Sequence, residues 1–148
     1  MCDRERHMQS AAVFMILRKK EQILLLQRQA TGWMDGQFSV PAGALDSDET
    51  VKSAAIREAL EEVGVIISPY DVIYAHTMHC KTGNSAWMGH FFVADNWKNE
   101  LRICEPDKHS QVMWCEINAL PDNLIAYVRQ ALTMIARGES YSEFGWES

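Results

Sequence analysis

Apolar residues recur along this chain in short runs, and segments rich in polar residues or glycine separate them. Residues 11–17 and 23–27 are apolar runs of strand length, and the largely charged residues 18–22 between them predict a hairpin turn. Residues 31–36 have the composition of a loop. Similar runs predict further strands or extended segments at residues 38–41, 65–67, 72–79, 87–94 and 112–116.

Another part of the chain repeats apolar positions at helical intervals. Ile56, Leu60 and Val63 are spaced four and three residues apart, so we expect this side of a helix to face the core. Aspartate and serine at positions 46–48 offer caps for the start of this helix. Gly64 is well placed to end it.

A second helix is predicted over residues 123–137. Its apolar side consists of Leu124, Val128, Ala131, Leu132 and Ile135. Strands precede and follow the first helix, and this order predicts an α/β or α+β fold. The 148 residues, 47% of them apolar, can bury one sizeable core. We therefore expect residues 1–148 to form a single domain, with terminal tails at 1–8 and 139–148.

Three glutamates gather on one side of the first predicted helix. Glu58, Glu61 and Glu62 fall within an arc of about 100°, because successive helical residues rotate by about 100°. Like charges at these spacings repel each other, so a bound cation would stabilise the cluster, and hard divalent ions prefer such oxygen ligands. Ala54 and Ala55 lie beside the glutamates and leave room for a ligand or loop. The alternative for an isolated cluster is a solvated, glutamate-rich face.

The spacing of these glutamates to earlier residues is more specific. The segment 43–65, GALDSDETVKSAAIREALEEVGV, resembles the signature of the Nudix hydrolases over 23 consecutive residues without a gap. Its departures are mild: Ala59 replaces a larger aliphatic residue, Ala44 replaces a frequent histidine or lysine, and Asp46-Ser47-Asp48 replaces Glu-x-Gly. Asp48 in place of glycine should stiffen the loop. Every charged or glycine position is filled, by Gly43, Glu49, Arg57, Glu58, Glu61, Glu62 and Gly64.

The resemblance implies a three-layer α/β/α sandwich with a mixed central sheet. It also implies hydrolysis of a nucleoside diphosphate linked to another group X, with Mg²⁺ or Mn²⁺ as the cofactor. Glu58, Glu61 and Glu62 would then be catalytic residues that hold the metal, and the carbonyl of Gly43 would be a further metal ligand. None of the departures removes one of these ligands.

The reaction explains why such ligands are needed. The oxygens of a pyrophosphate repel an attacking water, so a site must offset their charge and aim the nucleophile. Divalent ions do both, and they lower the pKa of bound water. By the same resemblance, Arg57 and Glu49 would orient the loop and the carboxylates through a salt bridge. Ordinary pairing of two surface charges is the alternative for Arg57 and Glu49.

Outside the motif, single residues suggest substrate contacts. Arg28 ends the second predicted strand, where related enzymes often carry an arginine that touches a substrate phosphate, although a solvent-exposed arginine is equally expected there. Many Nudix enzymes recruit another glutamate, as metal ligand or general base, from the region before the last strand. Glu105 is our first candidate for this catalytic role, and Glu100 is the second. Lys108 is a candidate phosphate contact, although charged loops are usually only solvated.

Several histidines and aromatic residues allow no firm assignment. Four histidines show no metal-ligand spacing on a common element, and we expect ordinary buried or exposed side chains: His76, His79, His90 and His109. Three aromatic residues would either stack on a base or pack in the core: Trp33, Phe38 and Trp87.

Composition narrows the partners and the compartment. The net charge of −6 argues against a general surface for nucleic-acid polymers. No apolar run is long enough to span a membrane, and residues 1–10 lack the apolar region of a signal peptide. We therefore expect a cytoplasmic protein with reduced, mostly packed thiols rather than disulfides or zinc ligands. The scattered cysteines are Cys2, Cys80, Cys104 and Cys115.

Three functions compete on these residues. The leading one is a pyrophosphohydrolase whose small-molecule substrate is a nucleoside triphosphate or a similar small nucleotide. The second is a non-catalytic Nudix module that senses a nucleotide, but such modules commonly lose a motif glutamate and this chain has all of them. The third is an acidic helix that mediates protein contacts. The segment TGWMDGQFSVPAG before the motif, and EPDKHS, Trp114 and Leu120-Pro121 after it, extend the resemblance over residues 11–137 to small single-domain bacterial Nudix proteins. A homodimer, which is common in the family, stays open.

Overall fold

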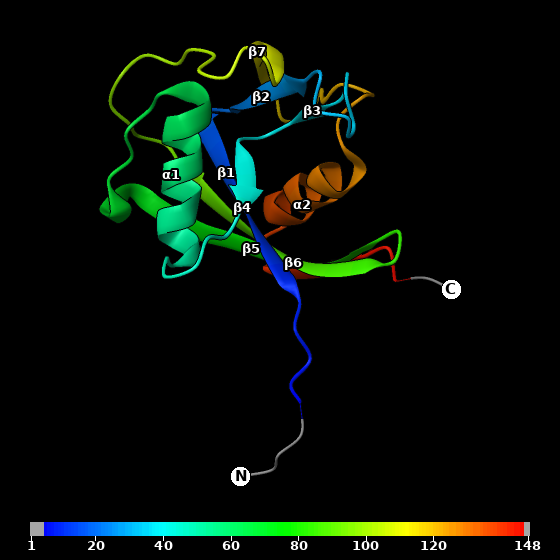
Figure 1. Cartoon of the computed structure of the whole chain (residues 1–148). Coiled ribbons are helices and arrows are strands. Elements are labelled where there is room, and N and C mark those ends of the chain that lie inside the picture. The colour runs from blue at the N-terminus through cyan, green and yellow to red at the C-terminus, as the bar shows by residue number, and fades with distance from the viewer. Residues whose placement is uncertain (1–4, 147–148) are drawn as a thin grey trace.

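Eight strands form one mixed sheet in the part of the chain that the structure describes (Figure 1). The computed structural model describes residues 5–146, so the outermost parts of both expected tails, with Cys2, lie outside it. The sheet order is β3-β2-β1-β6-β5-β8, with β4 paired to β1 and β7 paired to β2. The strands are β1 (Ser10–Lys19), β2 (Gln22–Arg28), β3 (Phe38–Ser39), β4 (Ala42–Ala44), β5 (Val72–Thr82), β6 (Ser85–Ala94), β7 (His109–Glu116) and β8 (Tyr141–Phe144).

One helix covers each face of this sheet. α1 (Val51–Val63) packs with one buried cluster and α2 (Ala126–Ala136) with the other, and a short helix η1 (Pro69–Asp71) precedes β5 (Figure 1). Within β1, Phe14 lies in the cluster of α2 while Val13 and Met15 lie in that of α1. Because successive strand side chains point to opposite faces, one continuous apolar run supplies both cores. The expected α/β/α sandwich is confirmed.

The strand predictions hold with small shifts. The hairpin joins β1 and β2 as expected, and both strands extend beyond the predicted bounds. The predicted strand at residues 38–41 is shorter, since β3 ends at Ser39, and the unpredicted strand β4 begins at Ala42. The extended segment 65–67 forms only an isolated bridge between Ile66 and Lys98. Two pairs in the sheet are parallel, β1 with β6 and β5 with β8, which makes the sheet mixed.

Small residues bring α1 onto the sheet together with two residues of the predicted apolar stripe, Ile56 and Val63. Ala54, Ala55 and Ala59 are fully buried, whereas Leu60 is 47% exposed. The prediction that Leu60 faces the core is therefore wrong. Ala54 and Ala55, which we expected to leave room for a ligand or loop, instead pack in the buried cluster between α1 and the strands. Short side chains at a contact allow a helix to approach its neighbour closely.

The ends of α1 have defined caps. Thr50 is the N-cap in place of the expected residues 46–48: its hydroxyl accepts the Ser53 N–H, and the Ser53 hydroxyl accepts the Thr50 N–H. Gly64 ends the helix as predicted, with φ of 77°. Asp48 also has a positive φ, of 64°, so the motif loop holds a non-glycine residue in the left-handed conformation.

The C-terminal residues described here belong to the sheet rather than to a free tail. We expected a tail from residue 139, but β8 pairs with β5 in parallel. His76 fastens this strand, since its Nδ1 lies 2.8 Å from the Glu139 carbonyl and its Nε2 lies 2.8 Å from the Ser142 hydroxyl. Phe144 packs against the cluster of α2, and the Trp146 indole N–H donates to the His79 carbonyl at 2.9 Å, whereas Tyr141 is half exposed.

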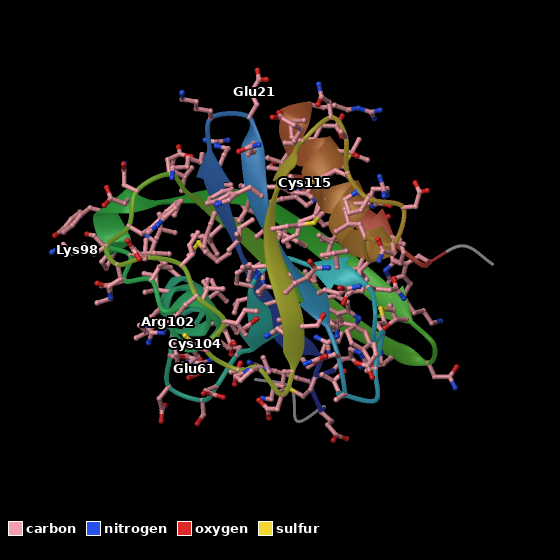
Figure 2. The ribbon with its side chains drawn as sticks, turned by 90° about the horizontal axis from the view of Figure 1, so that it is seen from above. Glu21, Glu61, Lys98, Arg102, Cys104 and Cys115 are labelled. Atoms are coloured by element: carbon pink, nitrogen blue, oxygen red, sulfur yellow. The ribbon has the colours of Figure 1, made fainter. Side chains whose placement is uncertain are left out.

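The loop between β6 and β7 runs along the C-terminal end of α1. The Cys104 N–H donates to the Glu62 carbonyl at 3.0 Å, and the Arg102 N–H donates to the Val63 carbonyl at 3.1 Å. Figure 2 shows Arg102 and Cys104 beside Glu61. These bonds hold the loop that leads to β7 against the C-terminal end of α1.

The cysteines within residues 5–146 are free thiols. Cys80 and Cys115 are buried free thiols, and Cys104 is a partly exposed one. Packed thiols were expected at these positions.

Neither α1 nor α2, nor any other described helix, has the length and apolar character needed to cross a membrane.

We expect Ala59→Leu to destabilise the protein more than Leu60→Ala. A leucine at the fully buried position 59 overpacks the contact of α1 with the sheet, which costs about 1–3 kcal/mol. Leu60→Ala removes a half-exposed side chain and keeps a strong helix former, so the change should stay below about 1 kcal/mol. Urea unfolding followed by circular dichroism measures both free energies of unfolding. A larger loss in Leu60→Ala would support the apolar stripe instead.

Candidate functional site

One guanidinium organises the acidic side of α1. Arg57 donates from Nε and Nη2 to the two oxygens of Glu49, at 3.1 and 2.7 Å. Glu49 also accepts the backbone N–H of Asp46 at 2.9 Å. The hydrogen bond from Arg57, followed by that from Asp46, lowers the pKa of Glu49. This bidentate pair ties the loop before α1 to the helix.

The same guanidinium faces two of the three clustered glutamates. Arg57 Nη1 lies 2.9 Å from Glu58 Oε1 and 3.3 Å from Glu61 Oε2, and Nη2 donates to the Ala44 carbonyl at 3.2 Å. Hydrogen bonds to Glu49 first, and also to Glu58 and Glu61, raise the pKa of Arg57. The repulsion expected among the glutamates is therefore already offset in part by a side chain of their own helix.

Glu62 differs from the other glutamates because it is buried. Its side chain is 7% exposed, compared with 50% for Glu61. Its Oε2 accepts the Ala42 N–H at 3.2 Å, and its Oε1 lies 3.5 Å from His109 Nε2. Burial, and next the neighbouring Glu58 carboxyl, hold the pKa of Glu62 well above its usual range. An ionised carboxylate at this position requires a positive partner.

A close approach between β4 and α1 explains the glycine at position 43. A Cβ built on Gly43 would collide with the carboxyl group of Glu58. Any side chain at this position would displace Glu58. The Gly43 backbone and the Glu58 carboxyl therefore form one continuous wall.

This wall borders a polar cavity of about 340 Å³. The cavity brings together residues from α1, β2, β4 and the loop before β7. The predicted site residues in its wall are Arg28, Gly43, Glu58, Glu61, Glu62, Glu105 and Lys108. Arg57 and Glu49 do not line the cavity, but Arg57 contacts Glu58, which does. Glu100, the second candidate for an extra acidic residue, does not line it either.

An aromatic cavity of about 250 Å³ adjoins the polar one. The two cavities share Arg28, Ala42 and Gly43. Aromatic rings form much of its wall, and Tyr127 packs edge-on against Trp87 with ring centroids 5.1 Å apart. Trp33 and Trp87, two of the expected aromatic candidates, line this cavity, whereas the third, Phe38, packs in the core.

Arg28 lies at the boundary between the two cavities. Its Nε donates to the Trp33 carbonyl at 2.9 Å, and its Nη2 donates to the Thr31 hydroxyl at 3.1 Å. The guanidinium also lies over the Trp33 ring, 4.9 Å from its centroid. It forms no ion pair with a carboxylate of the described residues, so its charge is available to an anion in either cavity.

Two cavity residues were missed by the sequence patterns. His109 was expected to be an ordinary histidine, yet it is 6% exposed and lines the polar cavity. Its position directly after the charged loop of Glu105 and Lys108 is the signal that could have drawn attention to it. Tyr127 was assigned only to the second helix, but it lies in the wall of the aromatic cavity. Burial raises the pKa of Tyr127.

The donor set of the polar cavity suits a hard divalent cation. Carboxylates of Glu58, Glu61 and Glu62 beside exposed backbone are the oxygen ligands that Mg²⁺ and Mn²⁺ prefer, and the raised pKa of Glu62 marks a cluster short of positive charge. Within residues 5–146, no three acidic, histidine or cysteine side chains converge as a ready-made ligand set. Glu58 and Glu61 instead pair with Arg57, so a cation would compete with Arg57 for their oxygens.

Comparison with known proteins identifies related sequences. A model of the NUDIX domain matches residues 6–136. An uncharacterized Nudix hydrolase of Bacillus subtilis is 30% identical over 106 residues, which cover 70% of this chain and 63% of that protein. An 8-oxo-dGTP diphosphatase of Proteus vulgaris is 29% identical, with 61% of this chain and 79% of that protein covered. An ADP-ribose pyrophosphatase of Methanocaldococcus jannaschii is 27% identical, with 76% and 64% covered.

The match therefore spans less than two thirds of the Bacillus and Methanocaldococcus relatives. Among solved structures, a MutT NUDIX hydrolase from Burkholderia pseudomallei superposes with a TM-score of 0.77 at 24% identity, covering 86% of this chain and 98% of that one. A MutT protein from Methanosarcina mazei superposes with a TM-score of 0.73 at 19% identity, covering 87% and 94%. These likenesses show the fold.

We expect Glu62→Gln to raise the melting temperature of the protein in a chelator at neutral pH. Burial, and next the Glu58 carboxyl, hold the folded-state pKa of Glu62 well above its usual range, so ionising Glu62 costs the folded state stability. This cost is fully present above the folded pKa, and it disappears as the pH falls from the folded pKa to the unfolded one. Thermal melts between about pH 5 and pH 8 measure the difference.

Glu61→Gln is the control for this measurement. Its side chain is half exposed and its loss also removes an ion pair with Arg57, so no gain in melting temperature is expected. An equal gain in both variants, or none in Glu62→Gln, would contradict the assigned burial cost.

Proposed function

Because this chain belongs to the Nudix family, we propose that it hydrolyses a diphosphate linkage in a nucleoside diphosphate linked to another group X, with the help of Mg²⁺ or Mn²⁺. One observation carries this proposal: Glu58 and the buried Glu62 share the polar cavity with Arg28 and Lys108. Oxygen ligands for a cation and positive groups for phosphate thus line the same space. A pyrophosphohydrolase needs both in one place.

Three carboxylates and one backbone carbonyl are the proposed metal ligands: Glu58, Glu61, Glu62 and Gly43. The cation supplies positive charge that offsets the phosphate oxygens and makes the attacking water more acidic. Glu62 binds it strongly because its buried carboxylate is short of a positive partner. The Ala42 N–H donates to the other oxygen of Glu62, Oε2, and holds it in place.

Arg57 and Glu49 are positioning residues in this proposal. Their bidentate pair fixes the loop that leads from Gly43 to α1. Arg57 also contacts Glu58 and Glu61, so it holds both carboxylates near the cavity before a cation arrives. Partners of this kind orient ligands and tune their affinity.

Residues across the cavity take the substrate roles. Arg28 and Lys108 are the proposed phosphate contacts, because both present positive charge to the cavity wall. Glu105 is the proposed general base, since its carboxylate lines the wall contributed by the loop before β7. Lys108 Nζ lies 3.3 Å from Glu105 Oε2, so the proposed phosphate contact and the proposed base form one ion pair.

The aromatic cavity favours a nucleotide over other diphosphates. A planar base fits between aromatic rings, and its phosphates would reach the polar cavity past the shared residue Arg28. Relatives named for 8-oxo-dGTP and for ADP-ribose support a nucleotide substrate. A nucleoside triphosphate or a similar small nucleotide is the proposed substrate.

A non-catalytic nucleotide sensor is the alternative. Every charged position of the motif is filled, and the polar cavity contains acidic groups on two sides, which favours the enzyme. A cytoplasmic location, a single domain and a homodimer stay predictions.

We expect the protein to release phosphate or pyrophosphate from at least one member of a panel of nucleoside triphosphates, nucleotide sugars and dinucleoside polyphosphates. Mg²⁺ or Mn²⁺ should be required, and EDTA should abolish the release. Glu62→Gln should lower kcat at least about 100-fold, because it removes the buried ligand carboxylate. Glu116→Gln, at the far end of β7 from the cavity, is the charge-matched control and should retain activity. Unchanged rates in both Glu61→Gln and Glu62→Gln would show that the proposed site is wrong.

We expect Arg28→Gln to raise KM for the preferred nucleotide about 10-fold or more, because a hydrogen bond from a charged group is worth about 1.5–3 kcal/mol. Mn²⁺ binding without nucleotide should change little. Arg18→Gln, which breaks an ion pair with Asp95 away from both cavities, is the matched control for steady-state kinetics. An unchanged KM in Arg28→Gln would exclude the phosphate contact.

A further inference from the structure

His109 is the buried histidine of the polar cavity, and the reaction proposed above leaves it without a role. It is the first residue of β7 and only 6% exposed. Its backbone is fixed twice, because its N–H donates to the Glu105 carbonyl at 3.0 Å and its register partner in β2 is Arg28. The ring therefore projects from a rigid part of the sheet.

The two ring nitrogens of His109 have different surroundings. Nε2 lies 3.5 Å from Glu62 Oε1. Nδ1 is buried and has no hydrogen-bond partner among the described residues. A buried N–H without an acceptor is rarer than an acceptor without a donor, so the ring should carry its proton on Nε2. That proton then faces the Glu62 carboxylate.

We propose that His109 is a positioning residue whose Nε2–H donates to Glu62 Oε1 and fixes the orientation of this carboxylate for cation binding. The inference rests on the proposed function, because it requires Glu62 to be a metal ligand. The Ala42 N–H already holds the other oxygen, Oε2, at 3.2 Å. With a donor on each oxygen the carboxylate has one orientation, and its remaining lone pairs are available to the cavity.

The observed separation has a physical explanation. A distance of 3.5 Å is longer than an ordinary hydrogen bond. A hydrogen bond from Nε2 to a carboxylate is charge-assisted, and we expect it to shorten to about 2.8 Å when a cation occupies the site. Both side chains are only 7% exposed, so such a bond is stronger there than at the surface. A ligand that is already oriented loses less entropy on binding the metal.

Isothermal titration of the full chain with Mn²⁺ alone tests this role. We expect His109→Leu to weaken Mn²⁺ binding about 10- to 100-fold, the usual effect of losing a partner of a metal ligand. His109→Gln keeps an N–H near the position of Nε2 and should recover most of the affinity. His90→Leu, at a partly buried histidine that lines neither cavity, is the matched control and should bind as the wild type does.

Each outcome decides between two claims. Wild-type affinity in His109→Leu would overturn the role of His109, and so would equal losses in the leucine and glutamine variants, because packing alone would then explain the effect. Glu62→Gln separates this inference from the proposed function. If Glu62→Gln binds Mn²⁺ normally, the proposed metal site is wrong; if only Glu62→Gln loses binding, the metal site stands and the role of His109 falls.

A measurement on the unsubstituted protein does not depend on how the variants fold. Long-range ¹H–¹⁵N correlation spectra distinguish the two neutral tautomers of a histidine. We expect the His109 ring to carry its proton on Nε2, and we expect the Nε2 signal to shift when Mg²⁺ is added. A proton on Nδ1, or a signal that does not respond to Mg²⁺, would overturn the inference.

Discussion

The close approach of α1 to the sheet is the constraint on which the candidate site depends. Three alanines of α1 are fully buried against the strands, and Gly43 presents no side chain where β4 passes Glu58. Because the helix lies this near, Glu58 and Glu62 face the backbone of β4 instead of open solvent. Larger residues at these contacts would move the helix outward and separate its carboxylates from β4 and from the start of β7.

Charge in this site is balanced unevenly, and the imbalance bears on function. Arg57 pairs with Glu49, Glu58 and Glu61, whereas Glu62 is buried with a raised pKa. A buried carboxylate costs the folded state stability, and a divalent cation would remove that cost on binding. Conflicts between local stability and the rest of the fold are expected at functional sites. His109, which supplies a polar contact to Glu62 without adding a fixed charge, fits the same arrangement.

Two adjoining cavities of different character suggest how one ligand would be recognised. The polar cavity carries the acidic and basic groups, the aromatic cavity carries the rings, and Arg28 belongs to both. The loop of residues 29–36 contributes to both walls through Thr31 and Trp33. A nucleotide has the same division between a planar base and charged phosphates. This correspondence supports a nucleotide more strongly than the polar cavity alone would.

The sequence by itself determined the parts of the protein that depend on neighbours along the chain. The alternation of strands with two helices, the stop at Gly64 and the glutamate spacing of α1 could be predicted, because their contacts lie within one element or one loop. Only the tertiary structure decided that Ala59 is buried and Leu60 is half exposed. A helix that packs closely against a sheet favours small side chains over large ones at the contact. The tertiary structure also placed His109 in the wall of the polar cavity and Tyr127 in the wall of the aromatic cavity. Strand pairing and helix packing between distant segments place those side chains, and no spacing along the chain encodes such contacts.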